Sequence, residues 1–289
     1  MKAAVTYSTP TISDMRPEVP SRSRQSNTAT PAKSNGGARI KRTLATLRAL
    51  AFCASVIVST GDMSTGVASA DQRECLAMGG NVQSGNVCRI YEETPTYSSD
   101  LRFRTDYPDS RPVLDFVTQT RDQFVRAAQS PGARGLPYQL TVRYDHYRSG
   151  QPIRSYSELG QPWHGTQTLV LKINRSMDPN TVLGTKFKSF TFDYDHNRPV
   201  TFDTLFAPGT NPMTSIYPAV KTELERQQLD RKFKLAPAAV WQDPSHYQNF
   251  AITDDAVIFF FGSGELPISV EAGPLFAPVS RANLPPLQL

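Results

Sequence analysis

The sequence predicts an α+β fold: a twisted antiparallel sheet packed by helices. Several segments alternate between apolar and polar residues, as half-buried strands do, and two segments repeat apolar residues at helical spacing. Strands and helices also follow one another without the regular β-α-β rhythm of a parallel sheet. Residues 71–289 suffice for one large or two small domains. We expect a single α+β domain over 100–285, with halves of about 100–180 and 181–285.

The first strand and helix are expected between residues 100 and 130. Residues 100–107 alternate, which predicts a half-buried strand. Asp109 or Ser110 can cap the helix that follows, and Pro112 lies in its first turn. The Ser-Pro-Gly sequence at 130–132 predicts where this helix ends.

Three further alternating segments, 138–147, 167–173 and 186–194, predict neighbouring strands of an antiparallel sheet with one solvent-exposed face. A turn-rich connection is expected at 199–206. A second helix is expected at 212–228, and its internal proline should make the first turn irregular.

The C-terminal part predicts a hairpin, because residues 250–253 and 257–261 flank Asp254-Asp255. Residues 258–261 are apolar on both faces, which indicates a central strand buried on both sides. The alternative is an exposed patch that inserts into a membrane, although such runs aggregate. Gly262-Ser263-Gly264 indicates a tight turn.

Positive charge is concentrated at the N-terminus. The chain has a net charge of +5, but residues 1–70 hold nine Lys and Arg against three Asp and Glu, and residues 71–289 hold 22 against 23. A basic protein often binds nucleic acid or an anionic membrane. Here the excess charge belongs to a segment that looks removable, so we expect no nucleic-acid partner.

That segment has the three parts of a secretory signal. Basic residues at 39–48 form a positive region, residues 49–58 are apolar, and Ala68 and Ala70 are the small residues that a signal peptidase reads. Cleavage is therefore predicted before Asp71. The ten apolar residues are fewer than the roughly 20 that span a bilayer. An uncleaved anchor is the alternative.

The expected organisation is therefore a disordered extension at 1–38, a signal peptide at 39–70 and a disulfide-containing segment at 71–99. Residues 1–38 are rich in Ser, Thr, Pro and Asn and cannot bury enough surface to fold. The mature protein is expected to be secreted or associated with the cell envelope, without a stable transmembrane span.

Removal of the signal leaves two cysteines, Cys75 and Cys88. An even pair in an exported chain indicates a disulfide, and the glycines between them let the loop bend. The alternative is a reactive or metal-binding thiol pair, which lacks the usual C-x-x-C spacing and partner histidines. No cofactor is expected.

Several motifs are spread over residues 72–285. They are Tyr-Pro-Asp at 107–109, Thr-Gln-Thr-Arg-Asp at 118–122, Thr-Phe-Asp-Thr-Leu at 201–205, the run Tyr-Gln-Asn-Phe-Ala-Ile-Thr-Asp-Asp at 247–255, Val257 to Phe261, Gly-Glu-Leu at 264–266 and Ala-Gly-Pro at 272–274. Together they resemble the secreted immunogenic antigen family of mycobacteria and related actinobacteria. The second half also resembles the extracellular, lysozyme-sensing domain of certain bacterial anti-sigma factors.

The resemblance implies a secreted or envelope-associated α+β protein with a twisted sheet and a β-grasp-like core. It implies no well-defined chemistry, although some members carry an esterase label. The chain contains no G-x-S-x-G motif of the α/β-hydrolases.

Resemblance to the esterase-labelled branch nevertheless points to one candidate triad. Ser215 would be the nucleophile, His246 the base, and Asp203 or Asp243 the orienting acid. The alternative is structural, with Ser215 capping a helix and His246 on the surface.

A repeated tripeptide, Tyr-Asp-His at 144–146 and 194–196, raises the possibility of a metal site built from two Asp-His pairs. Both copies lie at predicted strand ends, where polar residues are common, and no third anchoring motif accompanies them. We therefore expect no metal.

Three functions follow from these observations. The first is a secreted, non-catalytic interaction protein with immunogenic character, and the second is a secreted or cell-wall carboxylic-ester hydrolase that acts on short acyl chains. The third is a module that binds lysozyme or a glycan, by analogy of fold alone. The expected partner is an unknown protein, glycan or lipid outside the cytoplasm, and the chain is expected to be a monomer.

Overall fold

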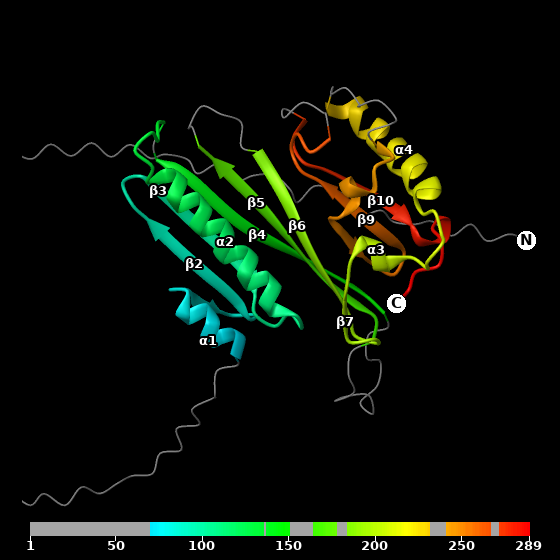
Figure 1. The fold of residues 1–289 in the computed structure, drawn as a ribbon, viewed down its shortest axis with the longest axis horizontal. Coiled ribbons are helices and arrows are strands. Elements are labelled where there is room, and N and C mark those ends of the chain that lie inside the picture. Colours follow the sequence, from blue (N-terminus) through cyan, green and yellow to red (C-terminus); the bar gives the residue numbers. More distant parts are fainter. Residues whose placement is uncertain (1–69, 136, 151–163, 178–183, 232–240, 267–271) are drawn as a thin grey trace, which may run out of the picture. The chain divides into compact units, whose positions relative to one another are not determined.

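The fold comes from a computed structural model of the full chain, which describes residues 70–135, 137–150, 164–177, 184–231, 241–266 and 272–289. These residues belong to the compact unit Met63–Leu289. The predicted extension and most of the predicted signal peptide, including Ala68, lie outside the described residues. The described part contains two sheets with helices packed on them, which confirms the α+β class (Figure 1).

The larger sheet has seven strands, whose order in the sheet is their order along the chain. They are β1 (Asn81–Gln83), β2 (Val87–Glu93), β3 (Tyr97–Arg104), β4 (Tyr138–Ser149), β5 (Thr166–Ser176), β6 (Gly184–Asp193) and β7 (Arg198–Val200). Neighbouring strands are antiparallel except for β3 and β4. Parallel neighbours need a crossover connection, and the helix α2 (Ser110–Ala128) provides it.

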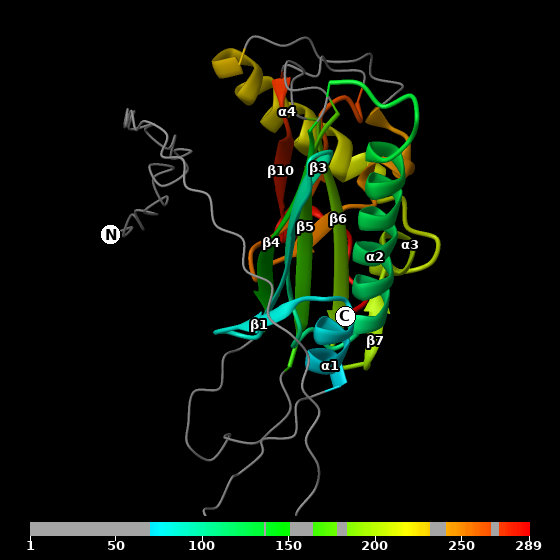
Figure 2. The same ribbon diagram turned by 90° about the vertical axis from the view of Figure 1, so that its left-hand side faces the viewer.

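Helix α2 lies across one face of this sheet, the grasp-like arrangement that was expected (Figures 1 and 2). Its apolar stripe, which includes Val113, Val117 and Phe124, is buried in one core with Leu101 and Leu140 of the sheet. The short helix α1 (Ala70–Ala77) contacts β1 and β2. Because α1 and α2 share this core, one face of the β2–β4 region is covered by helices.

The three predicted neighbours, β4, β5 and β6, do pair antiparallel. The expectation that one face is exposed is wrong for β5, because its residues 166–171 are all buried. On the side away from α2, Val170 packs with Ala251 and Phe260 of the smaller sheet. The second sheet therefore covers a surface that alternation alone would assign to solvent.

The smaller sheet has the strand order β10-β9-β8, with β8 at Phe250–Ile252, β9 at Ala256–Phe261 and β10 at Leu275–Ser280. The predicted hairpin and central strand are confirmed as β8 and β9. Phe259, Phe260 and Phe261 are all buried, so the alternative of a membrane-inserting patch is wrong. The sequence did not predict β1, β2, β7 or β10.

The described residues of this second part form four helical segments: α3 (Phe202–Leu205), α4 (Met213–Arg231) and the 3-10 helices η3 (Pro244–Tyr247) and η5 (Arg281–Asn283). The predicted turn-rich connection thus contains β7 and α3. Helix α4 confirms the second predicted helix and buries Ile216, Val220 and Leu224. Its start is irregular, since the Thr214 and Ser215 N–H groups bond to carbonyls three residues earlier.

Ser189 of β6 connects the two sheets through hydrogen bonds. Its N–H donates to Asn249 Oδ1 at 3.1 Å, and its hydroxyl accepts from the Phe250 N–H at 3.0 Å. The Phe260 N–H donates to the Asn249 carbonyl at 2.9 Å. Asn249 therefore links β6 to the hairpin of the smaller sheet.

Candidate functional site

A hollow of about 360 Å³ lies between α3, the start of α4 and η3. Polar and apolar atoms contribute about equally to its lining, which comprises Phe202, Asp203, Phe206, residues 207–212, Met213 and Pro244. Each residue of the predicted triad belongs to one of the three segments around this hollow. Asp203 is in α3, Ser215 follows Met213 by two residues, and His246 follows Pro244 by two residues.

The structure brings these segments together but does not assemble a triad. Asp203 lines the hollow, whereas Ser215 and His246 do not. Successive residues are rotated by about 100° in an α-helix and by about 120° in a 3-10 turn, so in either geometry Ser215 projects from a different side of α4 than Met213. Within the described chain, no hydrogen bond joins the side chains of Ser215, His246 and Asp203. The triad stays a prediction.

The second candidate for the acid, Asp243, has a structural role. Its carboxylate caps η3 by accepting a 2.9 Å hydrogen bond from the Ser245 N–H. This backbone hydrogen bond lowers the pKa of Asp243 below its ordinary value. Tyr247 in the same segment is fully buried, and its hydroxyl donates to the Trp241 carbonyl at 2.6 Å. This segment therefore contributes Tyr247 to the core.

Gly262-Ser263-Gly264 forms the predicted turn. The Ser263 N–H donates to the Thr185 carbonyl at 2.7 Å, and the Ser263 hydroxyl accepts from the Thr185 N–H at 3.2 Å. This serine connects β9 to β6.

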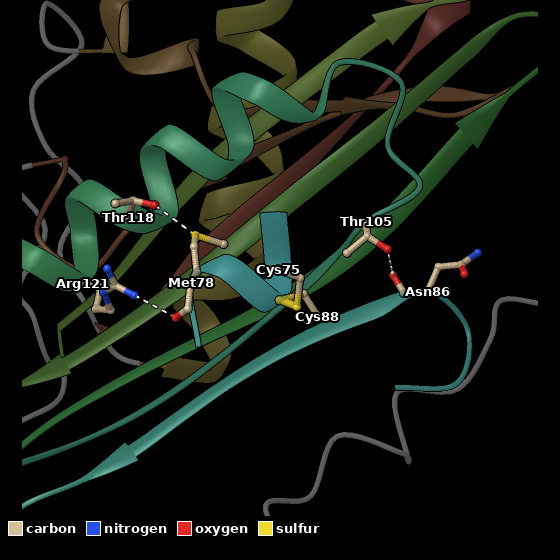
Figure 3. The surroundings of a disulfide bond; sticks show 7 residues. All are labelled: Cys75, Met78, Asn86, Cys88, Thr105, Thr118 and Arg121. Atoms are coloured by element: carbon tan, nitrogen blue, oxygen red, sulfur yellow. Dashed lines mark hydrogen bonds between the residues drawn. A yellow bond between two sulfur atoms is a disulfide. The ribbon is translucent and has the colours of Figure 1, made fainter. Parts of the chain in front are cut away.

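The predicted disulfide between Cys75 and Cys88 is present and fully buried, and it joins α1 to β2 (Figure 3). Met78 in the turn after α1 is held against α2, because the Arg121 guanidinium donates to its carbonyl at 3.3 Å and the Thr118 hydroxyl contacts its sulfur at 3.1 Å. A Cβ at Gly80 would lie 2.9 Å from the Cys75 sulfur, so only glycine fits there.

The two Asp-His tripeptides do not form one site. Strand β5 separates β4, which carries Asp145 and His146, from the β6–β7 turn, which carries Asp195 and His196. Asp195 instead accepts a hydrogen bond from His164 Nδ1 at 2.7 Å. Across the described residues there is no group of three or more His, Cys, Asp and Glu side chains that could hold a metal ion.

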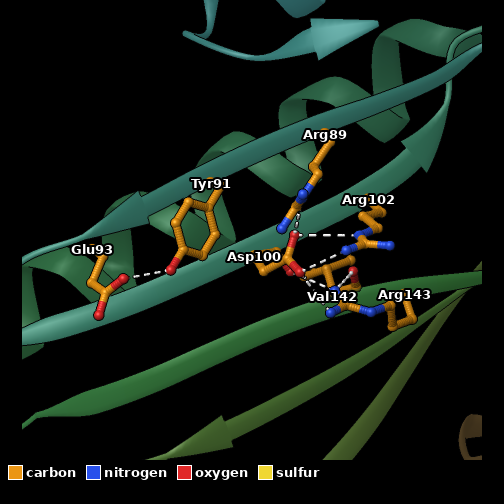
Figure 4. A network of polar contacts seen from close by, with 7 residues as sticks. All are labelled: Arg89, Tyr91, Glu93, Asp100, Arg102, Val142 and Arg143. Carbon is orange, nitrogen blue, oxygen red and sulfur yellow. Dashed lines mark hydrogen bonds and ion pairs between the residues drawn. The ribbon is translucent and has the colours of Figure 1, made fainter. Parts of the chain in front are cut away.

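A cluster of charged residues occupies the face of β2, β3 and β4 that α1 and α2 leave uncovered (Figure 4). The carboxylate of Asp100 contacts Arg89 Nε at 3.0 Å, Arg102 Nη2 at 3.1 Å and Arg143 Nη2 at 2.8 Å. Beside it, Tyr91 is 53% exposed, and the Arg89 guanidinium lies 5.2 Å from its ring centroid. We call Arg89, Tyr91, Asp100, Arg102 and Arg143 the arginine face.

Electrostatics keeps this cluster charged. Burial would raise the pKa of the Asp100 carboxyl, but the hydrogen bonds from Arg89 and Arg102 and the charge of Arg143 lower it below 3.8 overall. The five residues of the arginine face carry three positive charges and one negative charge, and the Glu93 carboxylate, which accepts a 2.5 Å hydrogen bond from the Tyr91 hydroxyl, adds a second negative charge beside them (Figure 4). The sequence pattern did not reveal this cluster. Alternation in β3 placed Arg102 on the polar side, but only strand pairing brings Arg89 and Arg143 to Asp100.

None of the described helices is both long and apolar enough to cross a membrane.

Comparison with known proteins gives close relatives. The chain is 40% identical over 215 residues to "Esterase Rv3036c" of Mycobacterium tuberculosis, a match that covers 74% of this chain and 88% of that protein. It is 35% identical over 220 residues to "Immunogenic protein MPB64" of Mycobacterium bovis and "Immunogenic protein MPT64" of M. tuberculosis, covering 76% of this chain and 90% of each relative.

The model of a family described as "Protein of unknown function (DUF3298)" matches residues 203–272. Among solved structures, a DUF3298 family protein from Pseudomonas aeruginosa aligns with a TM-score of 0.42 and 9% identity, over 68% of this chain and 91% of that one. The identity and coverage of the mycobacterial relatives are high enough to assign the family. The chain belongs to the mycobacterial family that includes the esterase Rv3036c and the immunogenic proteins MPB64 and MPT64.

Proposed function

We propose that this chain is an exported interaction protein that binds an acidic partner protein through the arginine face. The observation that carries the proposal is the preformed group of three arginines around Asp100, on a face that the described helices leave uncovered (Figure 4). Tyr and Arg are, with Trp, the residue types that contribute most to binding in protein interfaces, and here they lie partly exposed on one face of the sheet.

The arginine face has N–H donors that bond to no described residue. Arg143 Nη1 already donates to the carbonyls of Asp100 and Val142, at 2.7 and 3.0 Å, which fixes that side chain. By contrast, Arg102 Nη1 and both terminal nitrogens of Arg89 bond to no described residue. Their side chains are 37% and 31% exposed. Fixed guanidinium groups with free N–H donors favour carboxylates, because the paired donors match both oxygens.

Poly-L-glutamate serves as the acidic probe, in biolayer interferometry with the full chain. We expect saturable binding that weakens with salt, and roughly fivefold weaker binding in Arg102→Gln and in Tyr91→Ala. Arg126→Gln is the matched control, since it removes an exposed arginine from α2 on the opposite side of the sheet. Equal affinity in all four proteins, or no binding at all, would refute the proposal.

Export is part of this proposal. The predicted signal peptide and its cleavage site before Asp71 support it. The test is expression in a mycobacterial host, followed by mass spectrometry of the protein in the medium and in the envelope fraction. A mature chain that begins at Asp71 is expected, whereas an intact N-terminus in the envelope fraction would favour the anchor.

A carboxylic-ester hydrolase is the second candidate, because the 40% identical relative is named an esterase and the three segments of the predicted triad border one hollow. The test is hydrolysis of p-nitrophenyl acetate and butyrate by the full chain. Saturable turnover that is lost in Ser215→Ala and His246→Ala, but kept in the neighbouring control Ser245→Ala, would establish it. Turnover that is absent or equal in all variants would exclude this triad.

A further inference from the structure

The hollow between α3, α4 and η3 has the composition of a small-ligand site. Phe202 and Phe206 form its buried aromatic wall, with ring centroids 5.8 Å apart, and Met213 and Pro244 extend the apolar surface. Its volume of about 360 Å³ lies at the small end of the range for ligand pockets. A ligand there would be a compact molecule with an apolar part.

The charge of the lining has one sign. Asp203 is the only ionisable residue among the lining residues, and no Lys, Arg or His is among them. The Asp203 carboxylate is exposed and bonds to no described residue. A single unpaired carboxylate in a hollow whose lining is about half apolar favours a cation that carries an apolar group, since aromatic rings and carboxylates both attract ammonium groups.

The walls are held in place without a ligand. The Thr210 hydroxyl donates to the Ala207 carbonyl at 2.7 Å, and the Thr214 hydroxyl donates to the Asn211 carbonyl at 2.8 Å. The C-terminal segment fixes the end of α3, because the Gln288 N–H donates to the Leu205 carbonyl at 2.9 Å. Prolines at 208, 212 and 244 restrict the backbone further. Binding would therefore require little ordering of the protein.

We propose that this hollow is a binding site for a small organic ammonium compound, with its charged group at Asp203 and its apolar part against Phe206 and Met213. The site is independent of the arginine face, and it needs no catalytic role for Ser215 or His246.

The test uses the full chain labelled with ¹³C at the methionine methyl groups. The Met213 methyl reports on the hollow, and Met78, beside the disulfide, is the internal control. The probes are n-butylammonium, n-butanol and butyrate, which share a chain length and differ in charge. We expect n-butylammonium to shift the Met213 signal saturably, about fivefold more tightly than n-butanol, with butyrate the weakest and Met78 unmoved.

Variants separate charge from shape. Asp203→Asn should abolish the preference for n-butylammonium over n-butanol. The control Asp255→Asn should keep this preference, because that exposed carboxylate lies in the hairpin turn and not in the hollow. Thr210→Trp should block the binding of every probe by filling the hollow. Equal binding of the three probes would overturn the ammonium site and favour the acyl pocket of an esterase. A Met213 signal that no probe shifts would overturn the pocket itself.

Discussion

Breaking the disulfide between Cys75 and Cys88 tests how much the N-terminal segment depends on a covalent link. The bond joins α1 to β2, and both cysteines are fully buried in the core beneath α2. Reduction would free a segment whose other anchors include the two polar contacts from α2 to Met78. We expect the native fold to persist with lower stability.

The magnitude follows from the length of the closed loop. The cysteines are 13 positions apart, and a loop of this length gives about 3 kcal/mol of stabilisation by the chain-entropy estimate. In a domain of this size, each 1 kcal/mol changes the melting temperature by about 2–4 °C. Reduction should therefore lower the melting temperature by roughly 6–12 °C.

The assay is urea unfolding of three forms of the full chain: oxidised, reduced, and the double variant Cys75→Ala/Cys88→Ala. Cys53→Ser is introduced in all three, so that no third thiol can pair with a freed cysteine. The reduced form keeps the buried sulfur volume, whereas the double variant also loses it. The double variant should be less stable than the reduced form by a further 1–2 kcal/mol, on the order of a small cavity.

The loop-closure reasoning is refuted if reduction changes the free energy of unfolding by less than about 1 kcal/mol. If only the double variant is less stable than the oxidised form, the stabilisation comes from packing of the two sulfur atoms and not from loop closure.

Three further predictions concern single residues. Burial and neighbouring arginines lower the pKa of His146 from 6.5 to about 4, so between these pH values the unfolded chain takes up a proton that the folded chain does not. The free energy of unfolding should therefore fall as the pH drops from about 6.5 to about 4. Urea unfolding at several pH values should show this loss in the wild type but not in His146→Gln. The pKa of Asp100 is lowered in the folded chain, so its ionised carboxylate stabilises the fold, and Asp100→Asn should be less stable than the wild type by about 1–3 kcal/mol at pH 7. The difference in stability should shrink below pH 3.8, where the carboxylate becomes protonated, and a constant difference would contradict the ion-pair argument. Asn249→Ala removes the acceptor of the Ser189 N–H and should destabilise the chain by about 1–3 kcal/mol, while Asn249→Asp, which keeps an acceptor, should lose less in thermal unfolding.

Local pattern predicted much of this fold. The stripe of α2, the alternation of β3 to β6 and the all-apolar run of β9 depend on which neighbours in sequence share a face, so the residues alone reveal them. The disulfide was likewise predicted, because an exported chain with two cysteines has one possible internal pairing.

Strands β1, β7 and β10 were not predicted, because their sequences lack a clear strand pattern. β1 and β7 have three residues each, too few to show a period of two, and β10 contains a proline that argues against a strand. Sequence alternation also misassigned β5, because it reports the polarity of each position and not what covers it. Val170 and its neighbours are buried on the side away from α2 by strands that come 80 residues later.

The sequence and the tertiary structure also made different contributions to the candidate sites. By itself, the sequence determined the α+β class and the pairing of Cys75 with Cys88, because these follow from local periodicity and from cysteine number. Only the tertiary structure decided that Ser215, His246 and Asp203 share no hydrogen bond, and that Arg89, Arg102 and Arg143 meet at Asp100. The physical reason is that such contacts are set by strand register and helix rotation, which depend on how distant segments pack together.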